Sequence, residues 1–192
     1  MTWQGDVRLG VEAWGADQPP SDDAQAAGPD ADVEAVARKI LLDQLTGRAR
    51  SRKELADRLA AKNVPDELAT ALLDRFEEVG LIDDEAFARL WIADRQRSKG
   101  LASRALSQEL RRKGVDDEVV REALDEVEPG AEEAAARALV RKKLRTLTRV
   151  DDTTATRRLV GMLARKGYPS GLAFSVVRDE LNAAGRECGD DG

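Results

Sequence analysis

The stretch LSQELRRKGV at residues 106–115 occurs twice more in related form, as LADRLAAKNV at 55–64 and LVGMLARKGY at 159–168. The copies are offset by 51 and 53 residues. Each copy keeps two leucines four positions apart, then a lysine, then asparagine or glycine. Leucines at this spacing share one face of a helix, and glycine or asparagine after the last turn is typical of a helix C-terminus. The sequence therefore predicts one kind of helix end three times.

The residues around each end fit a Schellman motif, in which the chain turns back over the last helical turn. With Gly114 in the left-handed position, Leu110 and Val115 occupy the two sites whose side chains meet in this motif. Asn63 and Gly167 take the place of Gly114 in the other copies, and the lysine before each of them favours the negative end of the helix dipole. Three ends built alike indicate an internal repeat.

Each shared helix lies between two segments whose apolar residues also follow helical spacing, and no segment alternates as a strand does. We expect an all-α protein with three three-helix repeats at residues 35–84, 85–133 and 134–181. Units of about 50 residues are small for separate cores, so the repeats should stack into an elongated, curved tandem array. The first helix is expected to bury a stripe of Val33, Val36, Ala37, Ile40, Leu41 and Leu45.

The formal net charge of −6 over 192 residues is concentrated at the two ends. Residues 1–34 have a net charge of −7 and residues 182–192 of −2, whereas the residues between them have +3. Both ends are predicted to be disordered acidic tails because they carry too little apolar surface to form a core. Trp3 and Trp14 in the first tail fit either a partner-docking motif or aromatic residues that the tail tolerates.

Composition argues against most catalytic chemistry and against membrane insertion. The chain has no histidine, which excludes Ser-His and Cys-His catalysis and histidine-ligated metals, and its one cysteine, Cys188, has no nearby general base. The sequence contains neither the phosphate-binding loop G-x-x-x-x-G-K-S/T nor the dinucleotide-binding motif G-x-G-x-x-G. With no secretion signal and no membrane span, we expect a cytoplasmic monomer.

Two acidic clusters are the remaining candidates for chemistry. Asp83, Asp84 and Glu85 allow either a magnesium site or the acidic start of a helix, and Glu132 with Glu133 allows the same alternatives. The helix start is favoured because apolar residues with helical spacing follow. We therefore expect no enzymatic activity, no cofactor and no metal.

Positive charge within the repeats is concentrated in two blocks. Residues 89–113 carry eight bases and two acids, and residues 137–166 carry ten bases and two acids. The intervening residues 116–133 carry nine acids and one base, so stacking should place a positive stripe along one side. For any single charge, a solvated surface with helical ion pairs is the alternative. The residues expected to contact a polyanion or protein partner are Arg89, Arg95, Arg97, Lys99, Arg104, Arg111, Arg112, Lys113, Lys142, Lys143, Arg145, Arg157, Arg158, Arg165 and Lys166.

The run GLIDDEAFAR at residues 80–89 resembles the best-known signature of the RecX regulatory proteins. The resemblance continues through KGL at 99–101, LSQEL at 106–110 and RKGV at 112–115, and it covers about residues 35–181. RS at 50–51 and EL at 54–55 resemble the first unit of the family. Asn63 replaces the usual glycine, the third unit matches more loosely, and the acidic N-terminal segment is outside the pattern.

The resemblance implies a non-enzymatic regulator built from tandem three-helix repeats. RecX-like proteins bind the RecA recombinase, lie in the groove of its filament on DNA, and oppose ATP hydrolysis, strand exchange and filament growth. The implied partners are the RecA filament and DNA, the latter bound weakly or through the filament. The implied setting is DNA recombination, DNA repair and the SOS response.

The residues themselves leave two other functions open. Each turn after a shared helix joins two helices much as a helix-turn-helix does, so a direct DNA-binding regulator is the second hypothesis. Against it, acidic residues follow the turn in the first two units, at 66–67 and 116–118, where a groove-reading helix would face phosphate. A scaffold for some other partner is the third hypothesis.

Overall fold

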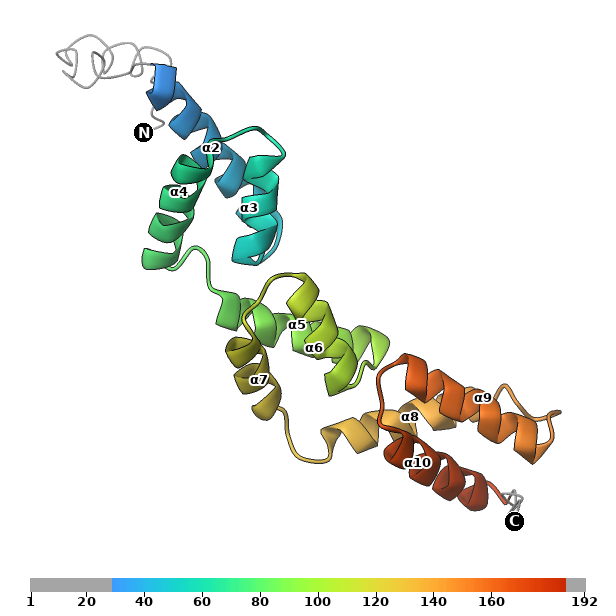
Figure 1. Ribbon diagram of the computed structural model, residues 1–192. Coiled ribbons are helices and arrows are strands. Elements are labelled where there is room, and N and C mark those ends of the chain that lie inside the picture. Colours follow the sequence, from blue (N-terminus) through green and yellow to red (C-terminus); the bar gives the residue numbers. More distant parts are fainter. Residues whose placement is uncertain (1–28, 186–192) are drawn as a thin grey trace, which may run out of the picture.

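A computed structural model describes residues 29–185, and within this range the chain forms nine α-helices and no strands. The predicted all-α fold is confirmed for this part of the chain. The helices, labelled as in Figure 1, are α2 (Pro29–Gly47), α3 (Arg52–Ala60), α4 (Asp66–Glu78), α5 (Asp84–Lys99), α6 (Ser103–Arg112), α7 (Asp117–Asp125), α8 (Ala131–Leu144), α9 (Asp152–Arg165) and α10 (Ser170–Ala183).

The helices form three units that follow one another along an elongated, bent array (Figure 1). Unit one contains α2 to α4, unit two α5 to α7, and unit three α8 to α10. Each unit has its own cluster of buried apolar side chains. The predicted tandem array of three three-helix repeats is therefore confirmed.

The three repeated helix ends are Schellman motifs. In α6, the Val115 amide donates to the Leu110 carbonyl over 3.2 Å. The Gly114 amide donates to the Arg111 carbonyl over 3.0 Å, and the equivalent bonds close α3 and α9. The left-handed residues are Asn63, Gly114 and Gly167, with φ of 57°, 78° and 91°.

Side-chain caps fix the starts of α3 and α5. The Ser51 hydroxyl accepts a hydrogen bond from the Glu54 amide over 3.2 Å, and the Glu54 carboxylate accepts one from the Ser51 amide, which completes a capping box at α3. The Asp83 carboxylate accepts from the Ala86 amide over 2.8 Å at the start of α5. The interpretation of the Asp83 cluster as a helix start is confirmed.

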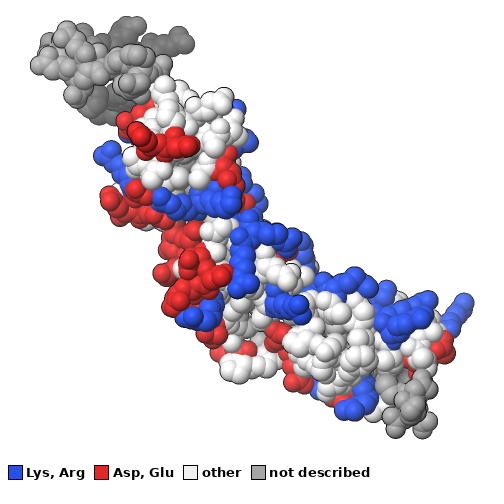
Figure 2. All heavy atoms as spheres, viewed as in Figure 1, with Lys and Arg blue, Asp and Glu red and all other residues white. Residues whose placement is uncertain are grey.

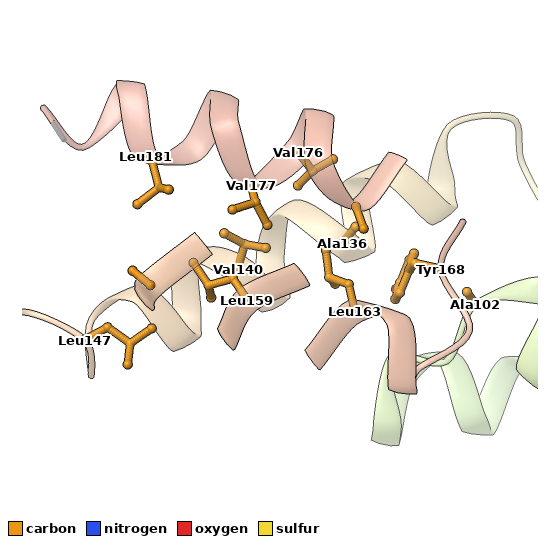
Figure 3. Close-up of a cluster of buried hydrophobic side chains, with 12 residues drawn as sticks. Ala102, Ala136, Val140, Leu147, Leu159, Leu163, Tyr168, Val176, Val177 and Leu181 are labelled. Atoms are coloured by element: carbon orange, nitrogen blue, oxygen red, sulfur yellow. The ribbon is translucent and has the colours of Figure 1, made fainter. Parts of the chain in front are cut away.

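The core of unit three extends into unit two. Leu159 and Leu163 of α9 pack with apolar residues of α8 and α10, and Ala102, which precedes α6, lies in the same cluster beside Tyr168 (Figure 3). All four of these side chains are at most 4% exposed. Units two and three therefore share buried surface, whereas the cluster of unit one contains residues of that unit alone.

Part of the predicted stripe on the first helix is wrong. Ala37 and Leu41 are fully buried, but Val33 is 39% and Val36 52% exposed. The reason is that the N-terminal turns of α2 extend beyond α3 and α4, so no neighbouring helix covers them (Figure 1).

The predicted tails lie almost entirely outside the described residues, as do Trp3, Trp14 and Cys188. One difference is visible, because α2 begins at Pro29 and its first turns occupy residues 29–34 of the predicted tail. The end of the tail was predicted from its acidic composition, and an acidic composition does not determine where a helix begins. From α2 to α10, every helix is too short or too polar to cross a bilayer.

Candidate partner-binding surface

The middle helices of the three units, α3, α6 and α9, are joined end to start. We call the contacts between units one and two the first junction, and those between units two and three the second junction. At the first junction, the Ser51 hydroxyl donates to the Lys113 carbonyl over 2.6 Å. At the second, the Ala102 amide donates to the Lys166 carbonyl over 2.9 Å. The C-terminal turn of each middle helix thus lies against the N-terminus of the preceding one.

This arrangement explains two of the glycines and the one asparagine. A Cβ atom on Gly114 would lie 2.4 Å from the Cβ of Lys53, and one on Gly167 would lie 2.7 Å from the backbone nitrogen of Ala105. Asn63, in the same place on α3, is exposed and faces no middle helix among the described residues. At this position of the repeat, glycine is therefore required only where a middle helix meets the preceding one.

The first junction contains a charged network around one tryptophan. Lys113 pairs with Glu54 over 2.6 Å, and its ammonium group lies 4.2 Å from the centre of the Trp91 ring. The indole N–H of Trp91 donates to Glu109 over 2.9 Å. Arg95 also bonds Glu109, over 3.2 Å, and its guanidinium lies 4.0 Å from the Trp91 ring centre. Two cations thus lie against the ring, and the ring stabilises both charges.

Electrostatics at this junction favour the ionised form of Glu54. Burial raises the pKa of Glu54, but the hydrogen bond and charge of Lys113 and the Ser51 amide outweigh burial, so the pKa is lowered. The Lys113 and Arg95 side chains are 18% and 23% exposed. Lys113 therefore joins unit two to unit one, and Arg95 holds Glu109 and Trp91 together within unit two. The sequence pattern indicated neither role.

Two acidic residues cap a helix of the preceding unit. Asp84 of α5 accepts a hydrogen bond from the Arg52 amide at the start of α3 over 2.9 Å. Glu132 of α8 accepts one from the Ser103 amide at the start of α6 over 3.0 Å. Burial is the main reason why the pKa of Asp84 is raised. Sequence reasoning missed both contacts, although an acid at the start of the first helix in units two and three was a visible signal.

The fifteen candidate residues divide by their partners. Four of them form ion pairs with carboxylates: Arg89, Arg95, Arg111 and Lys113. The Lys166 ammonium group donates to the Lys99 carbonyl at the second junction. The remaining ten form no ion pair within residues 29–185, and all are exposed: Arg97, Lys99, Arg104, Arg112, Lys142, Lys143, Arg145, Arg157, Arg158 and Arg165. Within the candidate set, these ten are therefore available to a partner.

Two arginines of the second basic block have a structural role instead. Arg141 of α8 bonds the Glu180 carboxylate of α10 over 2.7 Å, and Arg137 bonds it over 3.4 Å. The hydrogen bond and charge of Arg141, followed by those of Arg137, lower the pKa of Glu180 although burial opposes them. The Glu180 side chain is only 6% exposed. These pairs hold α8 against α10.

Five of the ten unpaired cations lie on middle helices. Figure 2 shows Lys and Arg atoms along the edge followed by α3, α6 and α9, and Asp and Glu atoms over α7. α6 and α9 carry Arg104, Arg112, Arg157, Arg158 and Arg165 of the unpaired set. We call this edge the basic edge. Its charges are exposed and suited to phosphate or carboxylate groups.

The three units match three models of one protein family. Residues 37–76 match the first three-helix domain of RecX, residues 83–124 the second, and residues 131–177 the third. The chain belongs to the RecX family. The order of the three RecX domains follows the order of the three units, and each matched range includes residues of all three helices of its unit.

RecX relatives match over most of their length. The chain is 47% identical over 173 residues to Regulatory protein RecX of Thermobifida fusca (strain YX), which covers 90% of this chain and 91% of the relative. It is 51% identical over 155 residues to the protein of the same name from Mycobacterium avium (strain 104), covering 80% and 89%. The chain is therefore similar to regulators along all three units.

Solved RecX structures have the same fold. The crystal structure of RecX from Lactobacillus salivarius superposes with a TM-score of 0.71 at 18% identity, covering 80% of this chain and 99% of that chain. A second crystal structure of regulatory protein RecX gives a TM-score of 0.70 at 22% identity, covering 90% and 85%. At these identities the likeness establishes the architecture.

Proposed function

We propose that this protein is a non-enzymatic regulator that binds RecA and inhibits it, in DNA repair, recombination and the SOS response. In this proposal the array lies in the groove of the RecA filament on DNA and opposes ATP hydrolysis, strand exchange and filament growth. The observation that carries the proposal is the line of unpaired cations along an elongated RecX-family array.

The geometry suits contact with a long helical partner. The end-to-start junctions keep α3, α6 and α9 in one row, so cations 51 to 53 residues apart in sequence face the same side. A row of this kind can touch successive subunits of a filament and the phosphates between them. Inhibition then follows from bridging subunits and filling the groove, with no bond made or broken.

The proposal assigns direct contact to the ten unpaired members of the candidate set. Arg95 and Lys113 serve this function indirectly, because they hold Trp91 and the first junction in place. Arg89 and Arg111 are exposed as well as paired, and a partner carboxylate or phosphate can compete for them.

RecA strand exchange and DNA-dependent ATP hydrolysis, measured with increasing amounts of this protein, test the proposal. Both rates are expected to fall as the protein approaches one molecule per several RecA subunits. Arg157→Ala with Arg158→Ala should weaken inhibition, whereas Arg75→Ala with Arg178→Ala, which removes the same charge from α4 and α10 outside the basic edge, should leave it nearly unchanged. Unchanged exchange and hydrolysis at a stoichiometric excess of the natural protein would exclude the proposed function.

A direct DNA-binding regulator of the helix-turn-helix kind is the second candidate, and one observation favours it. The helix after the turn has no acidic residue in its first turn in unit three, in contrast to units one and two. Binding to duplex DNA without RecA discriminates between the two functions. Strong sequence preference would support the second candidate, and weak binding with steep salt dependence supports the first.

A further inference from the structure

Each junction contains a cavity of about 440 Å³. The first lies between α3 and α6, and the second lies between α6 and α9 beside the start of α10. Positions that correspond in the repeat line both: Asp57 of the first cavity corresponds to Gln108 of the second, and Arg112 to Arg165. The two cavities are therefore one feature of the repeat seen twice.

The two cavities differ in the charge of the residues that line them. Glu54, Asp57 and Glu109 bring three carboxylates to the first cavity, together with Arg112 and Lys113. The charged residues that line the second cavity are Arg104 and Arg165, with no carboxylate among its described lining residues. Ala105 and Gln108 stand where the first cavity has Glu54 and Asp57. The second cavity has positive charge that the protein itself does not neutralise.

Because Gln108 of α6 stands where α3 has Asp57, Arg104 has no carboxylate partner on its own helix. In α3, Lys53 pairs with Asp57 over 2.8 Å. The corresponding residues of α6 are Arg104 and Gln108, and Arg104 forms no ion pair within the described part of the chain. Arg165 is likewise unpaired, and its guanidinium lies over the backbone of Gly161, where no side chain intervenes.

The start of α10 adds donors to the second cavity. Ser170, the first residue of α10, lines the cavity, and no side chain caps this helix start. The corresponding residues in units one and two are Asp66 and Asp117. An acid at these two starts satisfies the helix dipole internally, whereas the start of α10 remains available to an external anion.

We propose that the second cavity binds one phosphate group of a DNA strand. Arg104 and Arg165 supply guanidinium donors, which fit phosphate in a fork, and Ser170 supplies a hydroxyl and the helix start. A DNA strand is favoured because α9, which contributes Arg165 to the cavity, also carries the exposed and unpaired Arg157 and Arg158, so the same helix offers cations to neighbouring phosphates. The proposal rests on the DNA contact in the proposed function and assigns it to one site.

Fluorescence anisotropy of a labelled single-stranded oligonucleotide, without RecA, tests the site. We expect Arg104→Ala with Arg165→Ala to weaken binding at least about tenfold and to reduce the slope of log affinity against log salt by about one. The matched control, Arg75→Ala with Arg178→Ala, removes the same charge from exposed positions on α4 and α10, outside the basic edge, and should bind nearly as the natural protein does. Equal losses in both double variants would overturn the proposal in favour of diffuse attraction.

The source of the anion is distinguished by amide NMR shifts of Gly171 and Leu172 in the first turn of α10. Oligonucleotide should shift these signals in the natural protein and leave them unchanged in the Arg104/Arg165 variant. A shift with inorganic phosphate or ATP but none with oligonucleotide would overturn a DNA site. A shift with a polyglutamate peptide alone would indicate an acidic protein partner and would also overturn it. Because RecA is absent, failure here differs from failure to inhibit strand exchange.

Ser170→Asp provides a variant that should fold well, because it installs the residue type that units one and two already have. The new carboxylate complements the dipole of α10, so the melting temperature should stay the same or rise. Oligonucleotide affinity should nevertheless fall at least as far as in the double variant. Unchanged affinity with a normal melting temperature would show that phosphate binds elsewhere.

Discussion

The two junctions share one backbone arrangement and differ in the side chains that secure it. At the first junction, the Lys113–Glu54 ion pair and two side-chain hydrogen bonds join units one and two, and Lys113 also lies against the Trp91 ring of its own unit. At the second, Ala102 enters the core of unit three, Tyr168 donates to the Gly100 carbonyl over 3.2 Å, and a backbone bond joins the middle helices. One junction is mainly electrostatic and the other mainly apolar.

A repeat can therefore keep its backbone geometry while the side-chain contacts that stabilise it change. Charged contacts weaken with salt and depend on pH, whereas apolar burial does neither. Units two and three should therefore move as one body, and unit one should respond to solution conditions. The same exchange of side chains leaves cations unpaired at the second junction.

Among variants at the two junctions, Gly167→Ala should lower the free energy of unfolding most. The added methyl group lies 2.7 Å from the backbone nitrogen of Ala105, and φ at this residue is 91°. Opening the second junction exposes Ala102 and Tyr168, so we expect the free energy of unfolding to fall by about 4 kcal/mol. Urea denaturation followed by circular dichroism measures it.

Gly114→Ala is the counterpart at the first junction, and it should cost about 2 kcal/mol because opening that junction exposes mainly polar groups. Gly130→Ala serves as the control for backbone strain, since its φ is 83° and nothing lies within 4 Å of the added atom. It should cost about 1 kcal/mol. Equal losses at Gly114 and Gly167 would show that the two junctions are equally strong.

Lys113→Met should cost about 2 kcal/mol, because it leaves Glu54 without its partner in a site where both side chains are about one-fifth exposed. Lys166→Met, at the corresponding place in the second junction, loses only the bond to the Lys99 carbonyl and should cost less than about 1 kcal/mol. Thermal or urea denaturation of both variants checks the ranking. A larger loss at Lys166 would contradict the division into electrostatic and apolar junctions.

Tyr168→Phe should cost about 1 kcal/mol at neutral pH through the lost bond to Gly100. Burial, reinforced by Glu132, raises the pKa of Tyr168 to about 12 from its ordinary 10.0, so the folded protein holds the phenol proton more tightly than the unfolded chain does. Stability from this group is present below pH 10 and lost as the pH rises toward 12.

The advantage of tyrosine over phenylalanine at residue 168 should therefore vanish by about pH 11. Denaturation of both proteins between pH 8 and about pH 11 measures this difference. A constant difference across that range would mean that the phenol is not desolvated.

The smallest change in the free energy of unfolding is expected for Glu54, the carboxylate of the ion pair at the first junction. The pKa of Glu54 is lowered from 4.5, so its ion pair contributes stability above that value, and the contribution is lost as the pH falls below it. Glu54→Gln should cost less than about 1 kcal/mol at pH 7, and this cost should shrink as the pH is lowered toward about 3. Urea denaturation of the natural protein and of the variant at both pH values measures this cost. An unchanged cost at low pH would assign the effect to packing.

Local features of the fold could be predicted from the sequence. The φ values of Asn63, Gly114 and Gly167 and the bonds that close each helix end agree with the Schellman motif inferred from residue types alone. Such motifs depend on neighbours within six residues, so their signal is contained in a short stretch of sequence. The spacing of Leu106 and Leu110, both fully buried, predicted the inner face of α6 for the same reason.

Contacts between units could not be predicted in this way. Lys113 matched the other turn lysines in sequence, yet its contact with Glu54 depends on how α6 meets α3, across 59 residues. Exposure of Val36 depends on where α3 and α4 end in space. Charge counting found the positive blocks but not their pairing, so Arg95 and Lys113 were grouped with free cations such as Arg157. Their partners are set by tertiary packing.

The end-to-start row of middle helices also bears on how the length of such a protein can change. Each contact in the row joins unlike surfaces, a C-terminal turn and an N-terminus, so the contact does not close on itself. Within the described residues, the outer positions differ from the inner ones: Asn63 ends the row without a neighbour, and Asp151 caps α9 through the Thr154 amide over 2.8 Å. Lengthening or shortening in whole units of about 50 residues would keep every junction intact, whereas smaller insertions would break the row.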